Sequence, residues 1–449
     1  MKTSPKLSRL ENFFWVFLFI NPFLDIFNGL FLNIVKKIGV LDVETAAVSV
    51  TPSLVIRMLM LLVFVAYLYL SGDKKAILTF VPIAVVWVIG LMMEYKILGK
   101  IRFFTDAQYI ARFCYNIVLL FAYSHVMCSR GKSLEKLRFD LDRLISFTLI
   151  ILSLSIIICL IFGVGYPTYA DRHGYRGNRG YFYAGNDVTA ILLLLTPMSI
   201  AKFMSMKLRG TDLGTILLFV LPAPLAANTM MTIGTKTAFL AVAGTYAALL
   251  LYALFALIFK KNKTLIINYV ILFGVTGIIF GLLSLFTAGG LLKGILISIG
   301  VTFIEMEVTP VVDTLTSGRM LKLQWHWDVL MNGGVLSWLF GTGRGSHMAI
   351  AEMDLCEVFF YYGIVGAAAM LWVYVKAGID FVKALFKKFD VMGFALLIAL
   401  LLCCGYLTFA GHILFSVTSG FYFSFTIIYS RVYFAKKPED ILFFKTANR

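Results

Sequence analysis

The chain has 449 residues, of which 60% are hydrophobic and only 14% carry a charge. Soluble domains contain about 25% charged residues, so this composition excludes a soluble protein and predicts an integral membrane protein. The net charge of +16 is large enough for a nucleic-acid-binding protein. The placement of Lys and Arg along the chain excludes that class.

Stretches long enough to cross a bilayer recur along the whole chain. A spanning helix needs roughly 20 mainly apolar residues, and only helices or closed barrels satisfy their backbone groups in lipid. The first stretch contains Asn21, Asp25 and Asn28 and lacks a small-residue cleavage site, so we interpret it as a retained span and not a signal peptide. We therefore expect an all-α polytopic membrane protein, with one integral membrane domain over residues 1–449 and about twelve transmembrane helices. The predicted spans are about 13–34, 52–71, 76–93, 107–127, 144–163, 187–204, 214–232, 236–259, 265–286, 354–376, 391–411 and 413–433.

The positive charge is concentrated on one side of the predicted membrane. If the N-terminus is cytoplasmic, the inward segments hold 25 of the 40 Lys and Arg residues, and the longer outward segments hold 12. This asymmetry follows the positive-inside rule and places both termini in the cytoplasm. The excess of Lys and Arg is therefore explained by the orientation of the chain in the membrane, and no nucleic-acid partner is expected.

Two outward segments are long enough to carry a function. Residues 164–186 form an extracytoplasmic Arg-rich loop, and residues 287–353 form a large extracytoplasmic loop between the ninth and tenth spans. Within the large loop, residues 289–300 are too few and too rich in glycine to span, so we expect an interfacial helix there. A second, amphipathic helix is expected to begin near Arg319, with Ser317 as its cap, and to end at Gly333–Gly334.

The outward loops are rich in arginine, which binds phosphate through paired hydrogen bonds. Further cations lie within spans, near the ends predicted to face outward, where a charge requires a cavity or a partner such as Asp25. Several cations at one depth imply a polyanion at the outer leaflet. That polyanion is either a lipid headgroup or a lipid-linked pyrophosphate, whose departure fixed cations would stabilise. The loop arginines are Arg172, Arg176, Arg179, Arg319 and Arg344, and the cations within spans are Arg57, Arg112 and Lys236.

A cluster of carboxylates lies where the large loop enters the tenth span, at Glu352, Asp354 and Glu357. A carboxylate there can take a proton from a sugar hydroxyl that attacks an anomeric carbon, and partial desolvation would raise its pKa above the free value of ~4.3 and make it a better base. The alternative interpretation is helix capping. Two carboxylates without histidine at ligand spacing do not indicate a metal, so neither a metal nor another cofactor is expected. His347 is interpreted as a solvated loop residue or a catalyst, and His412 as a packing or interface residue.

Four short segments occur in an order, spacing and outward placement that together are typical of one family. They are Arg179 followed by Gly-x5-Asn ending at Asn186, "GTKTAFLAV" with Lys236, "SGR" (Ser317–Arg319) followed by Trp325, Trp327 and Gly341-x-Gly343, and "GIVG" (Gly363–Gly366). In these segments the chain resembles the O-antigen ligase/polymerase superfamily of membrane glycosyltransferases, and the resemblance covers most of the chain. It implies a GT-C-like fold.

The resemblance also implies roles for individual residues. Arg319 and Lys236 correspond to the family's pyrophosphate-binding cations, and either Arg176 or Arg179 corresponds to the arginine before the Gly-x5-Asn element. The family's usual catalytic base is a histidine eleven residues before the first glycine of GIxG, and Glu352 occupies that position here. The sequence is thus similar to an acidic variant of the family, in which the base is either Glu352 or Asp354.

From the residues and the resemblance together we expect an enzyme of the bacterial cytoplasmic membrane. The favoured hypothesis is an inverting, metal-independent polymerase of capsule or exopolysaccharide type, which transfers glycan from an undecaprenyl-pyrophosphate-linked donor to an acceptor glycan. The alternative is a ligase with the same donor and a terminal acceptor. A lipid-linked oligosaccharide flippase is less favoured, because the sequence shows neither a polar midplane site nor a repeat. Membrane lipids and a chain-length regulator are further candidate partners. The candidate substrate-binding residues are Arg319, Lys236, Arg179, Arg176, Arg57, Arg112, Asn186, Arg344, Trp325 and Trp327.

Overall fold

The computed structural model describes residues 5–38, 51–131, 133–169, 176–182, 184–308, 316, 318–347 and 350–444. Within these ranges, eleven helical segments are long and apolar enough to cross a membrane. Two strands of three residues each form a small hairpin. The all-α polytopic class predicted from the composition is therefore confirmed.

The helices and the two strands follow one another in this order along the chain. Their bounds are α1 (Pro5–Ile38), α2 (Pro52–Ser71), α3 (Lys74–Leu78), α4 (Phe80–Leu98), α5 (Phe103–Arg130), α6 (Leu134–Ile161), β1 (Pro167–Tyr169), β2 (Arg176–Asn178), α7 (Gly185–Met204), α8 (Leu213–Val220), α9 (Pro222–Ile233), α10 (Lys236–Lys260), α11 (Lys263–Phe286), α12 (Gly290–Val308), α14 (Arg319–Asn332), α15 (Val335–Phe340), η1 (Arg344–Ser346), α16 (Asp354–Lys387), α17 (Val391–Phe409), α18 (Ser419–Phe434) and η2 (Pro438–Ile441).

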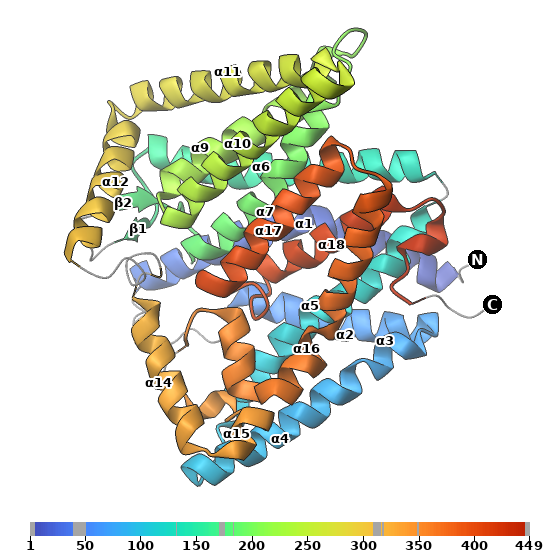
Figure 1. Ribbon diagram of the computed structural model, residues 1–449, viewed down its shortest axis with the longest axis vertical. Helices are drawn as coiled ribbons and strands as arrows, with labels where there is room; N and C mark the ends of the chain where they lie inside the picture. Colours follow the sequence, from blue (N-terminus) through green and yellow to red (C-terminus); the bar gives the residue numbers. More distant parts are fainter. Residues whose placement is uncertain are drawn as a thin grey trace.

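The bundle has two distinct ends (Figure 1). Both termini lie at one end, on the right of the view, and we call it the terminal end. The hairpin β1–β2, α12 and α14 lie at the opposite end, on the left, which we call the loop end. The two loops that the sequence assigns to the outer side therefore share one end of the molecule, opposite the termini.

The centre of the bundle is formed by α5 and α7, which are the most buried of the spanning segments. α7 is apolar on all sides, as a helix enclosed by others must be, and it packs against α9, α17 and α18. Lys202 lies in the last turn of this helix, and its ammonium group forms a 2.7 Å ion pair with Asp142 of α6. A rigid α7 fixes the position of the residues at its first turn, Asn186 and Asp187, at the loop end.

The last of the twelve predicted spans is wrong in its length. α18 has 16 residues, which is ~24 Å at 1.5 Å per residue and short of the roughly 30 Å hydrocarbon core. The residues before it, 410–418, are irregular and largely buried, with a positive φ of 64° at both Gly411 and His412. The apolar side chains that suggested a helix over residues 410–418 are buried in a segment whose backbone is irregular.

The tenth predicted span is broken in a way the sequence did not predict. α16 has non-helical backbone at Gly363, with φ of 66°. A Cβ atom there would lie 2.4 Å from the carbonyl carbon of Leu339, and one on Gly341 would lie 2.2 Å from that of Tyr361. The amide of Gly343 also donates to the Tyr361 carbonyl at 3.0 Å. The Gly-x-Gly and GIVG motifs are therefore two sides of one close backbone contact.

The outward loops contain elements that differ from those predicted. In the shorter loop, β1 and β2 pair antiparallel, with Tyr169 opposite Arg176. In the longer loop, the helix predicted at 289–300 extends to Val308. The amphipathic helix ends at Asn332 as predicted, but Gly318 occupies its N-cap position, and Ser317 lies outside the described residues.

Candidate active site

A pocket of about 380 Å³ lies at the loop end of the bundle. Its wall is built from α1, the first turns of α2 and α7, the third turn of α5, the loop before α16, and the irregular segment 410–418. These segments are far apart in the sequence, so only the folded chain brings their polar side chains together. The charged and polar residues that line it include Asp25, Arg112, Asn186, Asp187, Glu352 and His412.

Glu352 is the acidic residue that joins this pocket to the cations of the large loop. Its Oε2 atom lies 3.0 Å from Nη2 of Arg319, and its Oε1 atom lies 2.8 Å from Nζ of Lys322. Among the predicted loop arginines, Arg319 makes this contact with Glu352. Lys322, three residues further along α14 and thus on the same face of the helix, was not predicted.

The backbone of Glu352 is held in a conformation that L-residues rarely adopt, with φ of 62°. Its amide donates to Oε1 of Glu357 at 2.7 Å. On the other side, a Cβ atom on Gly411 would lie 2.3 Å from the Glu352 carbonyl, so only glycine fits there. Strain of this kind persists where the surroundings impose it, and it is concentrated at functional sites.

The pKa of Glu352 differs from the sequence-based expectation. Burial alone would raise it, but the hydrogen bond from Lys322 and the charges of Arg319 and Lys322 hold the pKa of this carboxyl below its usual value. The expected gain in basicity by desolvation is therefore wrong for the state in which both cations contact the carboxylate.

The other two carboxylates of the cluster are used inside the fold. Asp354 is fully buried and accepts hydrogen bonds from the amides of His412, Ile413 and Leu414, at 3.0, 2.6 and 2.8 Å. This carboxylate satisfies the irregular backbone before α18. Glu357 is also fully buried and accepts hydrogen bonds from the Tyr109 hydroxyl and the Glu352 amide. Of the two predicted alternatives for the base, Glu352 lines the pocket and Asp354 supports it.

Arg57 lies beside the pocket, but its guanidinium is fully buried. It forms a 2.8 Å ion pair with Asp25, which confirms Asp25 as a partner of an intramembrane cation. It also donates to Asn21, to Ser53 at 2.7 Å and to Thr418 at 2.8 Å. These contacts join α1, α2 and the segment before α18, and they make Arg57 part of the frame behind the pocket wall.

Two more of the predicted binding residues line the pocket, and a third lies next to it. Arg112 lines the pocket directly, as does Asn186, whose carbonyl accepts a hydrogen bond from Tyr406 at 2.9 Å. Arg179 lies over the ring of Tyr166 at 5.7 Å, next to the turn that leads to the pocket residue Phe182.

Lys236 is the first residue of α10, capped by Thr235. The residues just before it, through Ile233, contact β2 at Gly177. Arg176 lies in β2, opposite Tyr169, and Arg172 lies outside the described residues. Lys236 and the hairpin therefore lie together at the loop end, beside and not within the pocket lining.

Arg344 and the two tryptophans do not line the pocket either. The Arg344 side chain is buried, where Nη1 donates to the His347 carbonyl at 2.8 Å and the guanidinium lies 5.5 Å from the ring centre of Tyr361. Its amide donates to Asp106 at 3.0 Å, so the residue fastens the large loop to α5. Trp325 and Trp327 are exposed on α14.

His347 is buried against His326, which corrects the interpretation of His347 as a solvated loop residue. The two Nδ1 atoms are 2.5 Å apart, and Nε2 of His347 lies 2.7 Å from Oγ1 of Thr342. Because the Thr342 hydroxyl donates to the Phe360 carbonyl, it accepts from Nε2–H of His347. Nδ1 of His347 then accepts from Nδ1–H of His326, which fixes both tautomers in the neutral pair.

This pair predicts a loss of stability in acid. Burial, followed by the charge of Arg344, lowers the pKa of His326 to about 4, and burial together with His326 lowers the pKa of His347 to about 2. Unfolded imidazoles take up a proton near ~6.5, so stability should be constant above that pH and fall as the pH drops toward about 4. The thermal unfolding midpoint in detergent, measured across this range, should fall by several degrees in the wild type and by less in His347→Gln. Equal acid sensitivity of the two proteins would contradict this prediction.

The residues that sequence reasoning missed are Lys322, Asp187 and His412. His412 was interpreted as a packing or interface residue, yet it lines the pocket and lies within electrostatic range of Glu352 and Asp187. The sequence did contain a feature that could have indicated this. Gly411 and His412 lie between two apolar stretches, and a glycine followed by a polar residue at such a place is typical of a turn and not of a continuous helix. Asp187 accepts hydrogen bonds from Ser416 and Ser419 at 2.9 Å each, so it joins α7 to the same segment.

A bundle of apolar helices with a charged pocket at the end opposite both termini defines a polytopic membrane protein whose chemistry lies at a membrane face. A family model described as O-antigen ligase like membrane protein matches residues 8–302, which is more than half of the chain. The chain belongs to this family, and at a coarse level it is a membrane glycan ligase or polymerase. The match includes the pocket walls from α1, α2, α5 and α7, and it ends before Arg319 and Glu352. Neither the curated proteins nor the solved structures gave a significant match.

Proposed function

We propose that the protein is a polysaccharide polymerase, which transfers a glycan from an undecaprenyl-pyrophosphate-linked donor to an acceptor glycan at the outer face of the bacterial cytoplasmic membrane. The observation that supports this proposal best is the placement of Glu352. One carboxylate lines a pocket of the size of a small sugar site and is at the same time bound by two cations of the large loop. The candidate base Glu352 thus lies 3.0 Å from Arg319 and 2.8 Å from Lys322, the two groups that would bind phosphate.

The cations provide the site for the donor. Arg319 and Lys322 come from the first turn of α14, and Arg112 from the pocket wall. A guanidinium can bind a pyrophosphate through paired hydrogen bonds, and an ammonium adds a point charge. Groups fixed in this way stabilise the negative charge that develops on a leaving pyrophosphate. Arg179 and Lys236, beside the pocket, extend the positive surface toward the hairpin.

Donor binding and activation of the base are coupled in this arrangement. A pyrophosphate that draws Arg319 and Lys322 toward itself takes them away from Glu352. The carboxylate then loses the charges that depress its pKa, while burial, which raises the pKa, remains. The base therefore becomes stronger when the donor is in place.

The transfer step balances without a metal. Glu352 accepts the proton of the acceptor hydroxyl, whose oxygen attacks the anomeric carbon of the donor sugar. The bond between that carbon and the pyrophosphate oxygen breaks, and undecaprenyl pyrophosphate leaves with the electron pair. Attack from the face opposite the leaving group inverts the anomeric configuration.

The second candidate is a ligase, favoured by the description of the family that matches the chain. Polymerase and ligase share the donor and differ in the acceptor. The purified protein in lipid nanodiscs, with a chelator present, should consume an undecaprenyl-pyrophosphate-linked oligosaccharide and release undecaprenyl pyrophosphate. Longer lipid-linked glycans support the polymerase, and glycan joined only to a terminal acceptor supports the ligase. Donor that stays intact with either acceptor, or is only redistributed between leaflets, overturns both.

The coupling predicts a shifted pH profile for Lys322→Met. Lys322 lowers the pKa of Glu352 in the free enzyme, so its removal should raise that pKa. Because the base acts above its pKa, the acidic limb of kcat/KM against pH should move to higher pH. The matched control is Gln324→Met, an uncharged exposed position on the same helix, whose profile should coincide with the wild type. An acidic limb that is identical in Lys322→Met and wild type would contradict the assignment of Glu352 as the base.

A further inference from the structure

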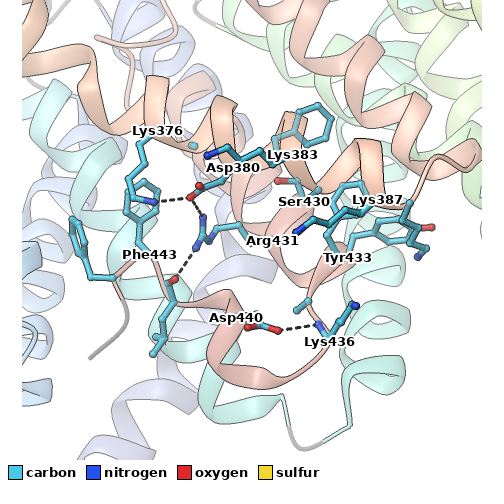
Figure 2. Close-up of a pocket in the computed structure, with 18 of the residues that line it drawn as sticks. Lys376, Asp380, Lys383, Lys387, Ser430, Arg431, Tyr433, Lys436, Asp440 and Phe443 are labelled. Carbon is cyan, nitrogen blue, oxygen red and sulfur yellow. Dashed lines mark hydrogen bonds and ion pairs between the residues drawn. The ribbon is translucent and has the colours of Figure 1, made fainter. Parts of the chain in front are cut away.

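A second pocket lies at the terminal end of the bundle, at the opposite end of α16 from Glu352. With a volume of about 800 Å³ it is larger than the candidate active site. Figure 2 shows its lining, which comes from the last turns of α16, the end of α18 and the segment that follows α18. Lys75 and Arg138 complete it from α3 and α6.

The pocket is strongly basic. Eight of its lining residues are Lys or Arg, and two are aspartates. Lysines at a membrane protein's inner end are expected from the positive-inside rule, but that rule places charge on a surface and does not by itself build a cavity. The contacts within the wall show that this cavity is held together by specific bonds.

Two arginines form the frame of the pocket. Arg138 donates to the Ala435 carbonyl at 2.7 Å, and Arg431 donates to the carbonyls of Ile441 and Leu442 at 2.9 and 2.6 Å. These bonds fix the segment after α18 in place. Arg431 also shares Asp380 with Lys376, at 3.2 and 2.6 Å (Figure 2).

Other cations on the same wall have no such partner. Lys383 and Lys387 are one helical turn apart on α16, and Lys383 follows Lys376 by seven residues, so all three lie on one face of the helix. In the part of the chain that the structure describes, no carboxylate lies within ion-pair distance of Lys383, Lys387 or Lys436. Like charges at this spacing repel each other, and an anion in the pocket would relieve that repulsion.

Apolar side chains are exposed beside these lysines. Phe386, between Lys383 and Lys387 in the sequence, is 86% exposed, and Val382 is also exposed. Exposed apolar residues on a spanning helix face lipid chains, so the mouth of the pocket adjoins the region where a headgroup meets its acyl chains. Basic pockets of this kind between spanning helices bind anionic headgroups.

We propose that this pocket binds the phosphate groups of an anionic ligand. The ligand is an anionic phospholipid of the adjacent leaflet; a soluble polyphosphate carries the same phosphate groups and is the alternative. Phosphate oxygens accept hydrogen bonds from Lys383, Lys387 and Lys436, while Arg138 and Arg431 hold the wall. The bound headgroup joins α16 to the segment after α18 and stabilises the end of the helix whose other end carries the loop of Glu352.

The test uses the full-length protein in detergent and follows its thermal unfolding midpoint, because a ligand that binds the folded state raises it. Phosphatidylglycerol should raise the midpoint more than phosphatidylcholine does. Lys383→Gln/Lys387→Gln should lose at least half of this increase. Lys261→Gln/Lys263→Gln, which removes the same charge from the exposed turn between α10 and α11 outside the pocket, should keep it.

A second measurement, with inorganic pyrophosphate added in place of lipid, distinguishes a phospholipid headgroup from a soluble polyphosphate as the ligand. If pyrophosphate reproduces the stabilisation, and the pocket variant loses it, the ligand is a soluble polyphosphate. If only the phospholipid stabilises, the ligand is the headgroup. The proposal is overturned if neither anion raises the midpoint above phosphatidylcholine, or if the two double variants respond alike.

Discussion

Replacing Glu352 with glutamine is expected to abolish glycan transfer without disturbing the fold. Glutamine keeps the size of the side chain and can still accept a hydrogen bond from Arg319, but it cannot take a proton from the acceptor hydroxyl. Loss of a general base typically costs 10²- to 10⁴-fold in rate. Donor consumption by the purified variant in nanodiscs should fall by about that factor. Its elution from size exclusion and its unfolding midpoint should match the wild type.

Two variants separate the base from its neighbours. In Asp354→Asn the amide can accept fewer than the three backbone hydrogen bonds that the carboxylate now accepts, so this variant should lose stability along with activity. His412→Gln removes the imidazole from the pocket and should reduce the rate less than Glu352→Gln does. A fully active Glu352→Gln together with an inactive His412→Gln would move the assignment of the base to His412.

The spanning helices could be predicted from the sequence because membrane helices depend on length and hydropathy alone. The same criteria fail where a buried segment is apolar but not helical. Residues 410–418 are apolar enough to be included in a span, yet their backbone turns through positive φ at His412 and is satisfied by Asp354. A tertiary contact across more than fifty residues decides that structure, and no local pattern records it.

The candidate site could be predicted in part, for a similar reason. Charges that are costly in lipid must find partners, so Asp25 could be predicted as the partner of an intramembrane cation. The orientation of each side chain could not be deduced. Glu352 and Asp354 are two residues apart, and a strained backbone at the first turns its side chain toward the pocket while the second is enclosed. Arg344 looked equivalent to Arg319 in the sequence, but its loop folds inward against α5.

The second large effect is expected at Arg57, on stability and not on donor binding. Methionine at this position leaves Asp25, whose side chain is 4% exposed, without its ion pair, and Ser53 and Thr418 without their donor. An uncompensated buried charge of this kind costs about 3–5 kcal/mol. For a chain of 449 residues the unfolding midpoint in detergent should fall by roughly 3–5 °C, while the protein that remains folded should keep its affinity for the donor.

The control for Arg57 is the double variant Asp25→Leu/Arg57→Met. Replacing both charges with apolar groups removes the unpaired carboxylate, and such replacements of buried pairs are often neutral. The double variant should therefore recover most of the lost stability. If Arg57 instead contacted the donor, the single variant would melt like the wild type and lose donor affinity, and the second substitution would restore nothing. Arg112→Met provides the opposite case, because Arg112 lines the pocket. In Arg112→Met we expect weaker donor binding and a nearly unchanged unfolding midpoint. The two variants together therefore distinguish Arg57, which stabilises the fold, from Arg112, which binds the donor.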